Sequence, residues 1–167
     1  MRKKVTIVGG GGAVGATAAQ RIIDRELADV VLADVLEGIP AGRALDMLES
    51  TPIIRSDVNA IGFTSRDSDY RGTANSDIIV ITAGFPRKPG MSRSDLLQGN
   101  YEIIKGVVGP VVTQSPDAIL IVVTNPLDAM AHAAFKLSGF PKHRVIGMAG
   151  VLDSGRMSTF VAQELGV

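Results

Sequence analysis

Short apolar runs alternate along the chain with longer segments in which apolar residues recur at helical spacing. Runs rich in Val and Ile are typical of strands buried in a parallel sheet, and the longer segments are typical of amphipathic helices. The pattern predicts strands at 4–8, 30–33, 57–63, 78–81, 119–123 and 144–147, and helices at 16–26, 38–50, 94–113, 127–138 and 151–165. This alternation predicts an α/β fold, a doubly wound six-stranded parallel sheet with helices on both faces. In the second helix, Ala44, Leu45 and Leu48 share one apolar face.

The first strand runs directly into a glycine-rich turn, residues 9–15, and a helix follows it. Strand, glycine turn and helix together are typical of the dinucleotide-binding fingerprint of the Rossmann fold. Glycine permits a tight turn and a close approach of pyrophosphate, which then lies at the helix N-terminus. Two registers fit, because either Gly9 or Gly10 can precede Gly12 and Gly15. A flexible turn without a ligand is the alternative.

An acidic residue, Asp34, ends the second predicted strand, nineteen residues beyond Gly15. In the dinucleotide-binding fold, a carboxylate at about this distance accepts hydrogen bonds from the ribose hydroxyls. It also repels a 2′-phosphate, so it favours NAD over NADP. The alternative is a surface aspartate that merely closes a strand.

Composition narrows the possible classes of protein. The 167 residues are 46% hydrophobic and 20% charged, with a net charge of zero, as expected for a single globular domain over 1–167. Balanced charge argues against a nucleic-acid partner. There is no cysteine for disulfides or thiol catalysis, and with two histidines no metal site is expected. No apolar run is long enough for a leader or a membrane span, so we expect a cytoplasmic protein.

A basic loop follows the fourth predicted strand, at the edge of the sheet where doubly wound folds bind ligands. It spans 84–93 and holds Arg87, Lys88 and Arg93 between glycines and prolines. A mobile loop with these cations is typical of a lid for an anionic substrate, because a guanidinium binds a carboxylate through two parallel hydrogen bonds. A solvated surface loop is the alternative.

Polar residues also follow the last two predicted strands. Asn125 offers a donor and an acceptor beside a cofactor. Asp153 and Arg156 are three residues apart near a helix start, so they share a face. The alternatives are an ordinary helix start and a surface ion pair.

Together these segments resemble the lactate/malate dehydrogenase family. The glycine turn, Asp34, TAGFPRKPGMSR, TNPLD and GVLDSGR occur in that family's order and spacing, and the resemblance runs from Lys4 to Gly166. It implies hydride transfer between a 2-hydroxy acid and the nicotinamide of NAD. The implied cofactor-binding residues are Gly9, Gly10, Gly12, Gly15, Asp34, Thr82, Ala83, Gly84, Asn100, Val123 and Asn125. The family comparison favours the register Gly9, Gly12, Gly15, with Gly10 and Gly11 as permissive filler.

The resemblance also implies roles for the residues that contact substrate. Arg93 corresponds to the lid arginine that polarises the reacting carbonyl, since a cation stabilises the charge that develops on its oxygen. Arg156 corresponds to the residue that binds the C1 carboxylate, and Asn125 contacts the substrate and the nicotinamide ribose. Asp153 corresponds to the carboxylate that orients a catalytic histidine.

Arg87 bears on the choice of substrate. In the family, a neutral glutamine at this position goes with lactate, and arginine goes with malate. The second carboxylate of a dicarboxylate is costly to bury without a cation partner. We therefore expect malate and oxaloacetate as the substrate pair, with a lactate dehydrogenase-type oxidoreductase as the alternative.

The family's acid–base histidine lies in a GHGD-like motif that these 167 residues do not contain. His132 and His143 do not match it and are expected to be structural or solvent-facing. We therefore expect an NAD-binding domain without the substrate domain, which binds NAD but turns over malate negligibly. A non-catalytic NAD-binding module remains open, and an NAD-dependent glycoside hydrolase is disfavoured by the missing cysteine. Apolar residues at 151, 152 and 161 predict a homo-oligomer.

Overall fold

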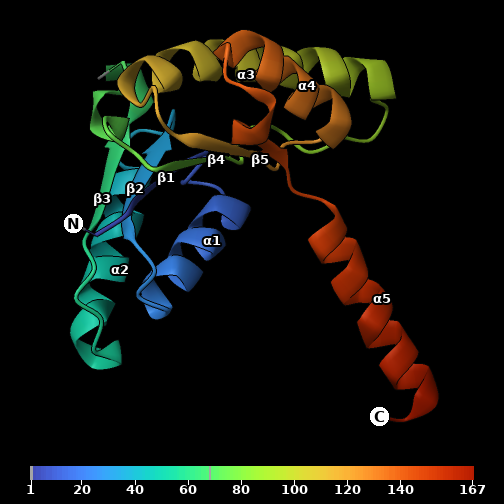
Figure 1. The fold of residues 1–167 in the computed structure, drawn as a ribbon, viewed down its shortest axis with the longest axis horizontal. Helices are drawn as coiled ribbons and strands as arrows, with labels where there is room; N and C mark the ends of the chain where they lie inside the picture. The colour runs from blue at the N-terminus through green and yellow to red at the C-terminus, as the bar shows by residue number, and fades with distance from the viewer. Residues whose placement is uncertain (1, 68) are drawn as a thin grey trace.

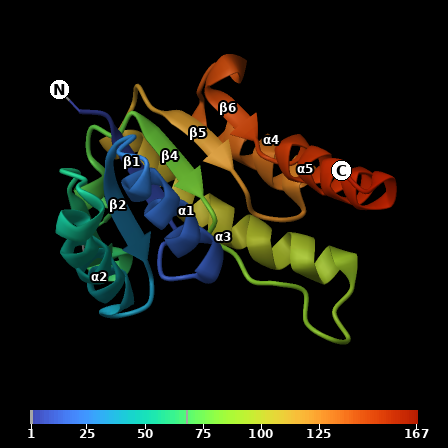
Figure 2. The same cartoon turned by 90° about the horizontal axis from the view of Figure 1, so that it is seen from below.

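The computed structural model describes residues 2–67 and 69–167, which form one parallel sheet with flanking helices (Figures 1 and 2). Within these residues the sheet has six strands in the order β3-β2-β1-β4-β5-β6. The strands are β1 (Lys4–Val8), β2 (Asp29–Asp34), β3 (Ala60–Thr64), β4 (Ile78–Ile81), β5 (Ile119–Val122) and β6 (Val145–Gly147). The helices are α1 (Ala13–Asp24), α2 (Ile39–Ile54), α3 (Arg93–Gln114), α4 (Leu127–Ser138) and α5 (Gly150–Leu165). The doubly wound fold is thereby confirmed.

The core forms two layers, one on each face of the sheet. Figure 1 shows α1 and α2 on one side of the sheet and α3 and α4 on the other. Ile7 packs with the α1 and α2 layer, whereas its neighbour Val8 packs with the α3 and α4 layer. Both side chains are almost fully buried. Burial on both faces explains why the central strands are continuous apolar runs.

The buried face of α2 differs from the predicted one. Ala44, Met47 and Thr51 are buried, whereas Leu45 and Leu48 are 54% and 36% exposed. The helix is also longer than predicted and ends at Ile54. The prediction that Leu45 and Leu48 share the packed face with Ala44 is therefore wrong.

The strand order sets the position of a ligand site. β1 and β4 are neighbours, and the helices that follow them lie on opposite faces of the sheet. A crevice opens at the carboxyl ends of two such strands, and ligands bind there in doubly wound folds. The residues that follow β1, β2, β4 and β5 therefore converge on one edge.

The last helix leaves the body of the molecule. Figure 1 shows α5 projecting from the end of the sheet, and none of its residues is buried. Among the described residues, no helix combines the length and apolar character needed to cross a membrane.

Candidate functional site

The glycine turn is tight, and its own backbone closes it. Gly9 has φ +89°, a conformation that favours glycine. The N–H groups of Gly9 and Gly10 both donate to Ala33 O, at 2.9 and 3.2 Å, and the Gly12 N–H donates to Gly9 O at 3.1 Å. A Cβ at Gly15 would collide with that same Gly9 carbonyl. The turn therefore runs from Gly9 to Gly12, and the longer of the two registers describes it.

Gly10 and Gly11 are not filler, so this part of the prediction is wrong. A Cβ on Gly10 would lie 2.8 Å from the side chain of Leu32, which is fully buried in β2. A Cβ on Gly11 would lie 2.9 Å from Asp34 Oδ2. Gly10 requires glycine because the turn packs directly on β2, and a side chain at Gly11 would displace the Asp34 carboxylate.

The first turn of α1 presents N–H groups without helical partners. The first hydrogen bond of the helix runs from the Ala16 N–H to Gly12 O at 3.0 Å. The N–H groups of Ala13, Val14 and Gly15 precede it, and no acidic side chain lies in this turn. This end of the helix can therefore bind an anion such as pyrophosphate. Ala13 and Val14 were not among the predicted cofactor-binding residues, because the helix begins three residues before its predicted start.

Two adjoining cavities flank this turn and share Gly9, Gly12, Thr82, Gly84 and Phe85 in their walls. One has a volume of about 350 Å³ and extends to Asp34 and the end of β2. The other has a volume of about 450 Å³ and extends to Asn125 at the end of β5. Their lining contains the predicted cofactor residues Gly9, Gly12, Gly15, Asp34, Thr82, Ala83, Gly84, Asn100, Val123 and Asn125.

Asp34 is held by two backbone donors. Its Oδ2 accepts the Gly11 N–H at 2.8 Å, and its Oδ1 accepts the Leu36 N–H at 3.1 Å. Tyr70 lines the same cavity and was not predicted, since the sequence around it shows no motif. Burial raises the pKa of Tyr70, and the nearby charge of Asp34 adds to this effect.

Asn100 joins the two loops beside the second cavity. Its side chain is buried, and its Nδ2 donates to Asn125 O at 2.7 Å and to Phe85 O at 3.2 Å. Its Oδ1 accepts the Phe85 N–H at 3.0 Å. These bonds use both donors of the amide, so Asn100 positions the loops and keeps only acceptor capacity toward a ligand.

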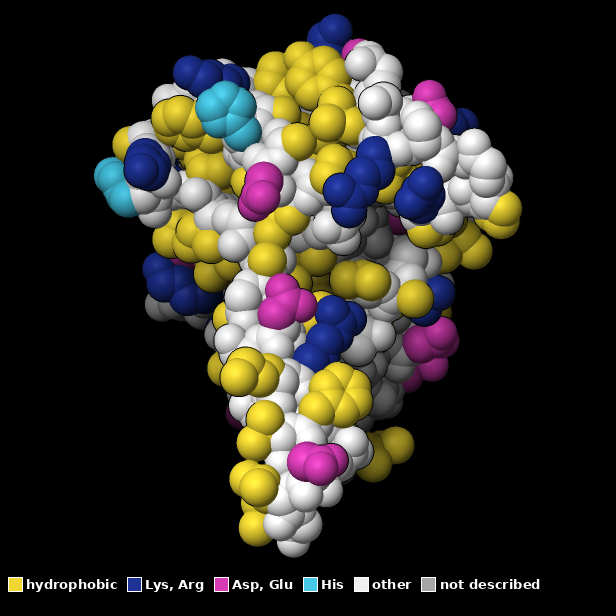
Figure 3. Space-filling model, turned by 90° about the vertical axis from the view of Figure 1, so that its right-hand side faces the viewer, with side chains coloured by type: hydrophobic (Ala, Val, Ile, Leu, Met, Phe, Trp, Pro, Cys, Tyr) yellow, Lys and Arg dark blue, Asp and Glu magenta, His cyan; other side chains and the backbone are white. Residues whose placement is uncertain are grey.

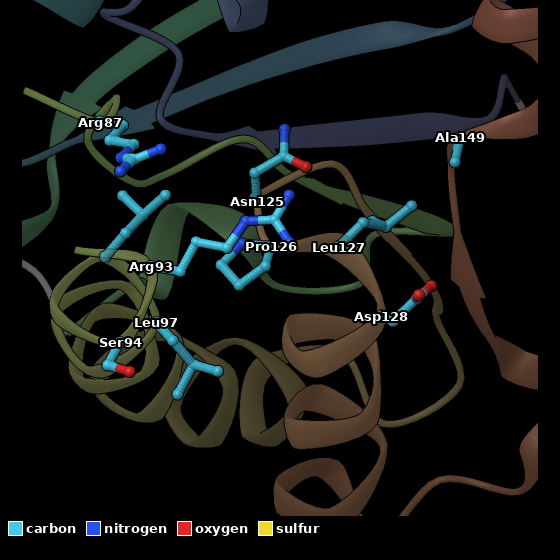
Figure 4. Close-up of a pocket in the computed structure, with 10 residues that line it drawn as sticks. Arg87, Arg93, Ser94, Leu97, Asn125, Pro126, Leu127, Asp128 and Ala149 are labelled. Carbon is cyan, nitrogen blue, oxygen red and sulfur yellow. The ribbon is translucent and has the colours of Figure 1, made fainter.

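A third cavity, of about 630 Å³, shares Asn125 with the second. Arg87, Arg93, Leu97 and Asp128 also line it. Figure 4 shows the Arg93 side chain extending from the start of α3 toward Asn125 and Pro126. Both arginines are exposed, and no ion pair to either occurs within the described residues. The cavity is therefore suited to a carboxylate ligand.

Hydrogen bonds hold the loop before α3 in place near Arg87 and near Arg93. Arg87 Nε donates to Met91 O at 2.8 Å. Ser92 and Asp95 form a capping box, in which each side chain accepts the other residue's backbone N–H. This cap places Arg93 at the first position of α3, next to the third cavity.

Asp153 and Arg156 lie apart from these cavities. They form an exposed ion pair on α5 at 3.3 Å, as their spacing predicts. Arg156 lines a separate hollow with apolar residues of α5 such as Val151 and Phe160. Neither residue lines the third cavity, although Ala149 at the N-cap of α5 does, so their catalytic and substrate-binding roles stay predictions.

The two histidines are exposed, as expected, and neither lines the three cavities. His132 lies on α4, and His143 lies in the short turn before β6. Over the described parts of the chain, no group of three or more His, Cys, Asp or Glu side chains is arranged to hold a metal ion.

Residues 3–147 match the family model described as lactate/malate dehydrogenase, NAD binding domain. The chain belongs to the lactate/malate dehydrogenase family. It is 58% identical to the malate dehydrogenase of Chloroherpeton thalassium over 98% of its length and 55% identical to that of Thermomicrobium roseum over 100%. It spans about half, 52%, of each of these curated relatives.

Solved structures of the family have the same fold as this chain. The apo malate dehydrogenase of Picrophilus torridus superposes on 100% of the chain with a TM-score of 0.95 and 46% identity. A Cryptosporidium parvum lactate dehydrogenase, in complex with lactic acid and nicotinamide adenine dinucleotide, gives 0.92 and 43% over the same share. The chain corresponds to 52% and 51% of those two chains.

NAD is the cofactor of this domain, and the residues present fit it. The open N–H groups of Ala13, Val14 and Gly15 suit the pyrophosphate. Asp34 at the far end of the first cavity suits the ribose hydroxyls.

Proposed function

We propose that this domain serves the interconversion of (S)-malate and oxaloacetate. The observation that carries the proposal is the third cavity, where Arg87, Arg93 and Asn125 lie directly beside the dinucleotide cavities. Two guanidinium groups complement the two carboxylates of a dicarboxylate. When bound, NAD accepts or supplies the hydride.

Each polar residue then has a proposed task. Arg93 stabilises the charge on the reacting oxygen, and Arg87 binds the carboxylate that distinguishes malate from lactate. Asn125 orients the substrate and the nicotinamide ribose. Arg156 binds the C1 carboxylate, and Asp153 orients the family's histidine. Ala149, the N-cap of the helix that carries both residues, lines the third cavity.

The test joins these 167 residues to the C-terminal half of the Chloroherpeton thalassium relative and compares oxaloacetate with pyruvate. We expect the chimera to prefer oxaloacetate. Arg87→Gln should lower kcat/KM for oxaloacetate on the order of 100-fold, since an unpaired buried charge costs about 3 kcal/mol. Lys88→Gln removes one positive charge from the same exposed loop and is the matched control.

Two alternatives predict different outcomes of this assay. Preference of the unmodified chimera for pyruvate would favour a lactate dehydrogenase-type enzyme, a class also found among the similar structures. NADH binding without turnover of either substrate would favour a non-catalytic NAD-binding module.

Assembly and location are part of the same proposal. α5 exposes a row of apolar side chains, among them Val151 at 81%, Met157 at 70% and Phe160 at 67%. Figure 3 shows hydrophobic side chains along the projecting part of the molecule. We propose that a second copy of the chain covers this face, because large exposed apolar patches drive association. The proposed location is the cytoplasm, where NAD is available.

A further inference from the structure

The glycine turn is one residue longer than the usual dinucleotide fingerprint. That fingerprint places one residue between its first two glycines. Here Gly9 makes the turn and Gly12 begins the helix, so Gly10 and Gly11 both lie between them. The Gly10 N–H faces β2, where it shares Ala33 O with the Gly9 N–H.

The Gly11 N–H has an acceptor outside the turn, because it donates to Asp34 Oδ2 at 2.8 Å. The Leu36 N–H holds the other carboxylate oxygen at 3.1 Å. An ionised carboxylate offers about four lone-pair sites, so both oxygens can still accept ribose hydroxyls. The two N–H groups therefore fix the plane of the carboxylate before a ligand arrives.

The need for glycine at this position comes from Asp34. Gly11 does not have a positive φ, so its backbone would accept an L side chain. A Cβ would lie 2.9 Å from Asp34 Oδ2, 3.0 Å from its Cγ and 3.3 Å from Ile39 Cγ2. The atoms in the way are mainly the far end of the Asp34 side chain, which can turn aside without disturbing the core.

We propose that Gly11 is a positioning residue that sets the specificity of the domain for NAD by holding the Asp34 carboxylate. A carboxylate fixed at both oxygens cannot swing away from a 2′-phosphate, so repulsion of NADP persists. The same fixed geometry favours NAD, because the carboxylate is ordered before binding. This proposal rests on NAD binding and explains how that site selects its nucleotide.

Titration of the 167-residue chain with NADH and NADPH tests the proposal. Gly11→Ala should weaken NADH binding about tenfold. The added Cβ pushes the Asp34 carboxylate aside and so breaks its hydrogen bond with the backbone N–H of residue 11. NADPH binding should change far less, so the preference for NADH falls while the urea midpoint stays near that of the original chain. Gly106→Ala is the control, because Gly106 is exposed on α3 with open space around it.

The background variant Asp34→Ser separates this role from a structural one. If Gly11 acts through Asp34, Gly11→Ala should cost little NADH affinity once the carboxylate is gone. A tenfold loss in both backgrounds would overturn the proposal and assign Gly11 to the pyrophosphate. Failure of the original chain to bind NADH would instead overturn the cofactor assignment and the proposal with it.

A measurement without Gly11→Ala covers the case in which that variant does not fold. In amide NMR spectra of the free chain, Asp34→Ser should shift the Gly11 amide more than the Gly10 amide, which bonds to Ala33 O. An unchanged Gly11 resonance would overturn the proposal.

Discussion

Asn100 shows how much one side chain can hold together at the site. Its amide bonds to backbone atoms of Phe85, at the base of the basic loop, and of Asn125, beside the substrate cavity. Its side chain is buried, and the hydrogen bonds that it makes are partly shielded from water. The spacing of the two loops therefore depends on Asn100.

Asn100→Ala should destabilise the domain by about 2 kcal/mol, because it leaves partly buried backbone groups of Phe85 and Asn125 without these partners. It should also weaken NADH binding, since the loops that line the second cavity separate. Urea unfolding and NADH titration measure the two effects. Gln98→Ala, on an exposed position of the same helix, serves as the control. Equal stability of Asn100→Ala and Gln98→Ala would contradict this view.

Sequence patterns identify residues that act through their side chains better than those that act through their backbone. Asp34 and Asn125 were predicted from their places at strand ends, and both line the cavities. Ala13, Val14 and Gly11 were missed because they contribute N–H groups, which every residue other than proline carries.

At the scale of elements, the start of α3 links the basic loop to the core. The capping box of Ser92 and Asp95 satisfies backbone N–H groups that the helix itself leaves open. Hydrogen bonds from Ser92, through its side chain and its backbone N–H, hold the pKa of Asp95 below its ordinary value. The native state therefore favours the charged carboxylate.

The contribution of Asp95 to stability should disappear in acid. A depressed folded pKa means that this contribution is complete above the unfolded pKa of about 4 and is lost as pH falls through the lower folded value. Urea unfolding of the original chain and of Asp95→Ala should differ at neutral pH and converge at pH values below about 4. A difference that stays constant down to the lowest measurable pH would exclude the charged cap.

The buried face of α2 shows why the packed side of a helix is harder to predict than the helix itself. Gly62 of β3 lies so close to Pro40 that a Cβ there would collide with the Pro40 carbonyl. This close approach sets which side of α2 meets the sheet, and it buries Met47 in place of Leu45. The periodicity of α2 alone carries no information about a glycine in a later strand.

For the whole molecule, the sheet was predictable and the course of its last helix was not. Apolar runs and the glycine turn determine a doubly wound sheet with little ambiguity. The sequence of α5 does not specify where this helix lies relative to the sheet, because none of its residues is buried in the core. The pairing of Asp153 with Arg156 could therefore be predicted, but the position of this pair relative to Arg87 could not.

Association through α5 should be visible in solution. We expect light scattering at tens of micromolar to show more than one chain per particle. Phe160→Glu should reduce the particle mass, because it places a charge in the apolar row. Leu27→Glu is the matched control, since Leu27 is 61% exposed and lies between α1 and β2. A particle of one chain's mass before any substitution would argue against the assembly.

The hydrogen bonds of the glycine turn also predict two different rates of amide hydrogen exchange within it. The N–H groups of residues 9–12 already have acceptors in the free chain, whereas those of residues 13–15 precede the first bond of α1. Amides with protein acceptors exchange hydrogen with solvent only when the structure opens locally. Adjoining stretches of a few residues therefore exchange at different rates, and a bound anion directly slows only the second.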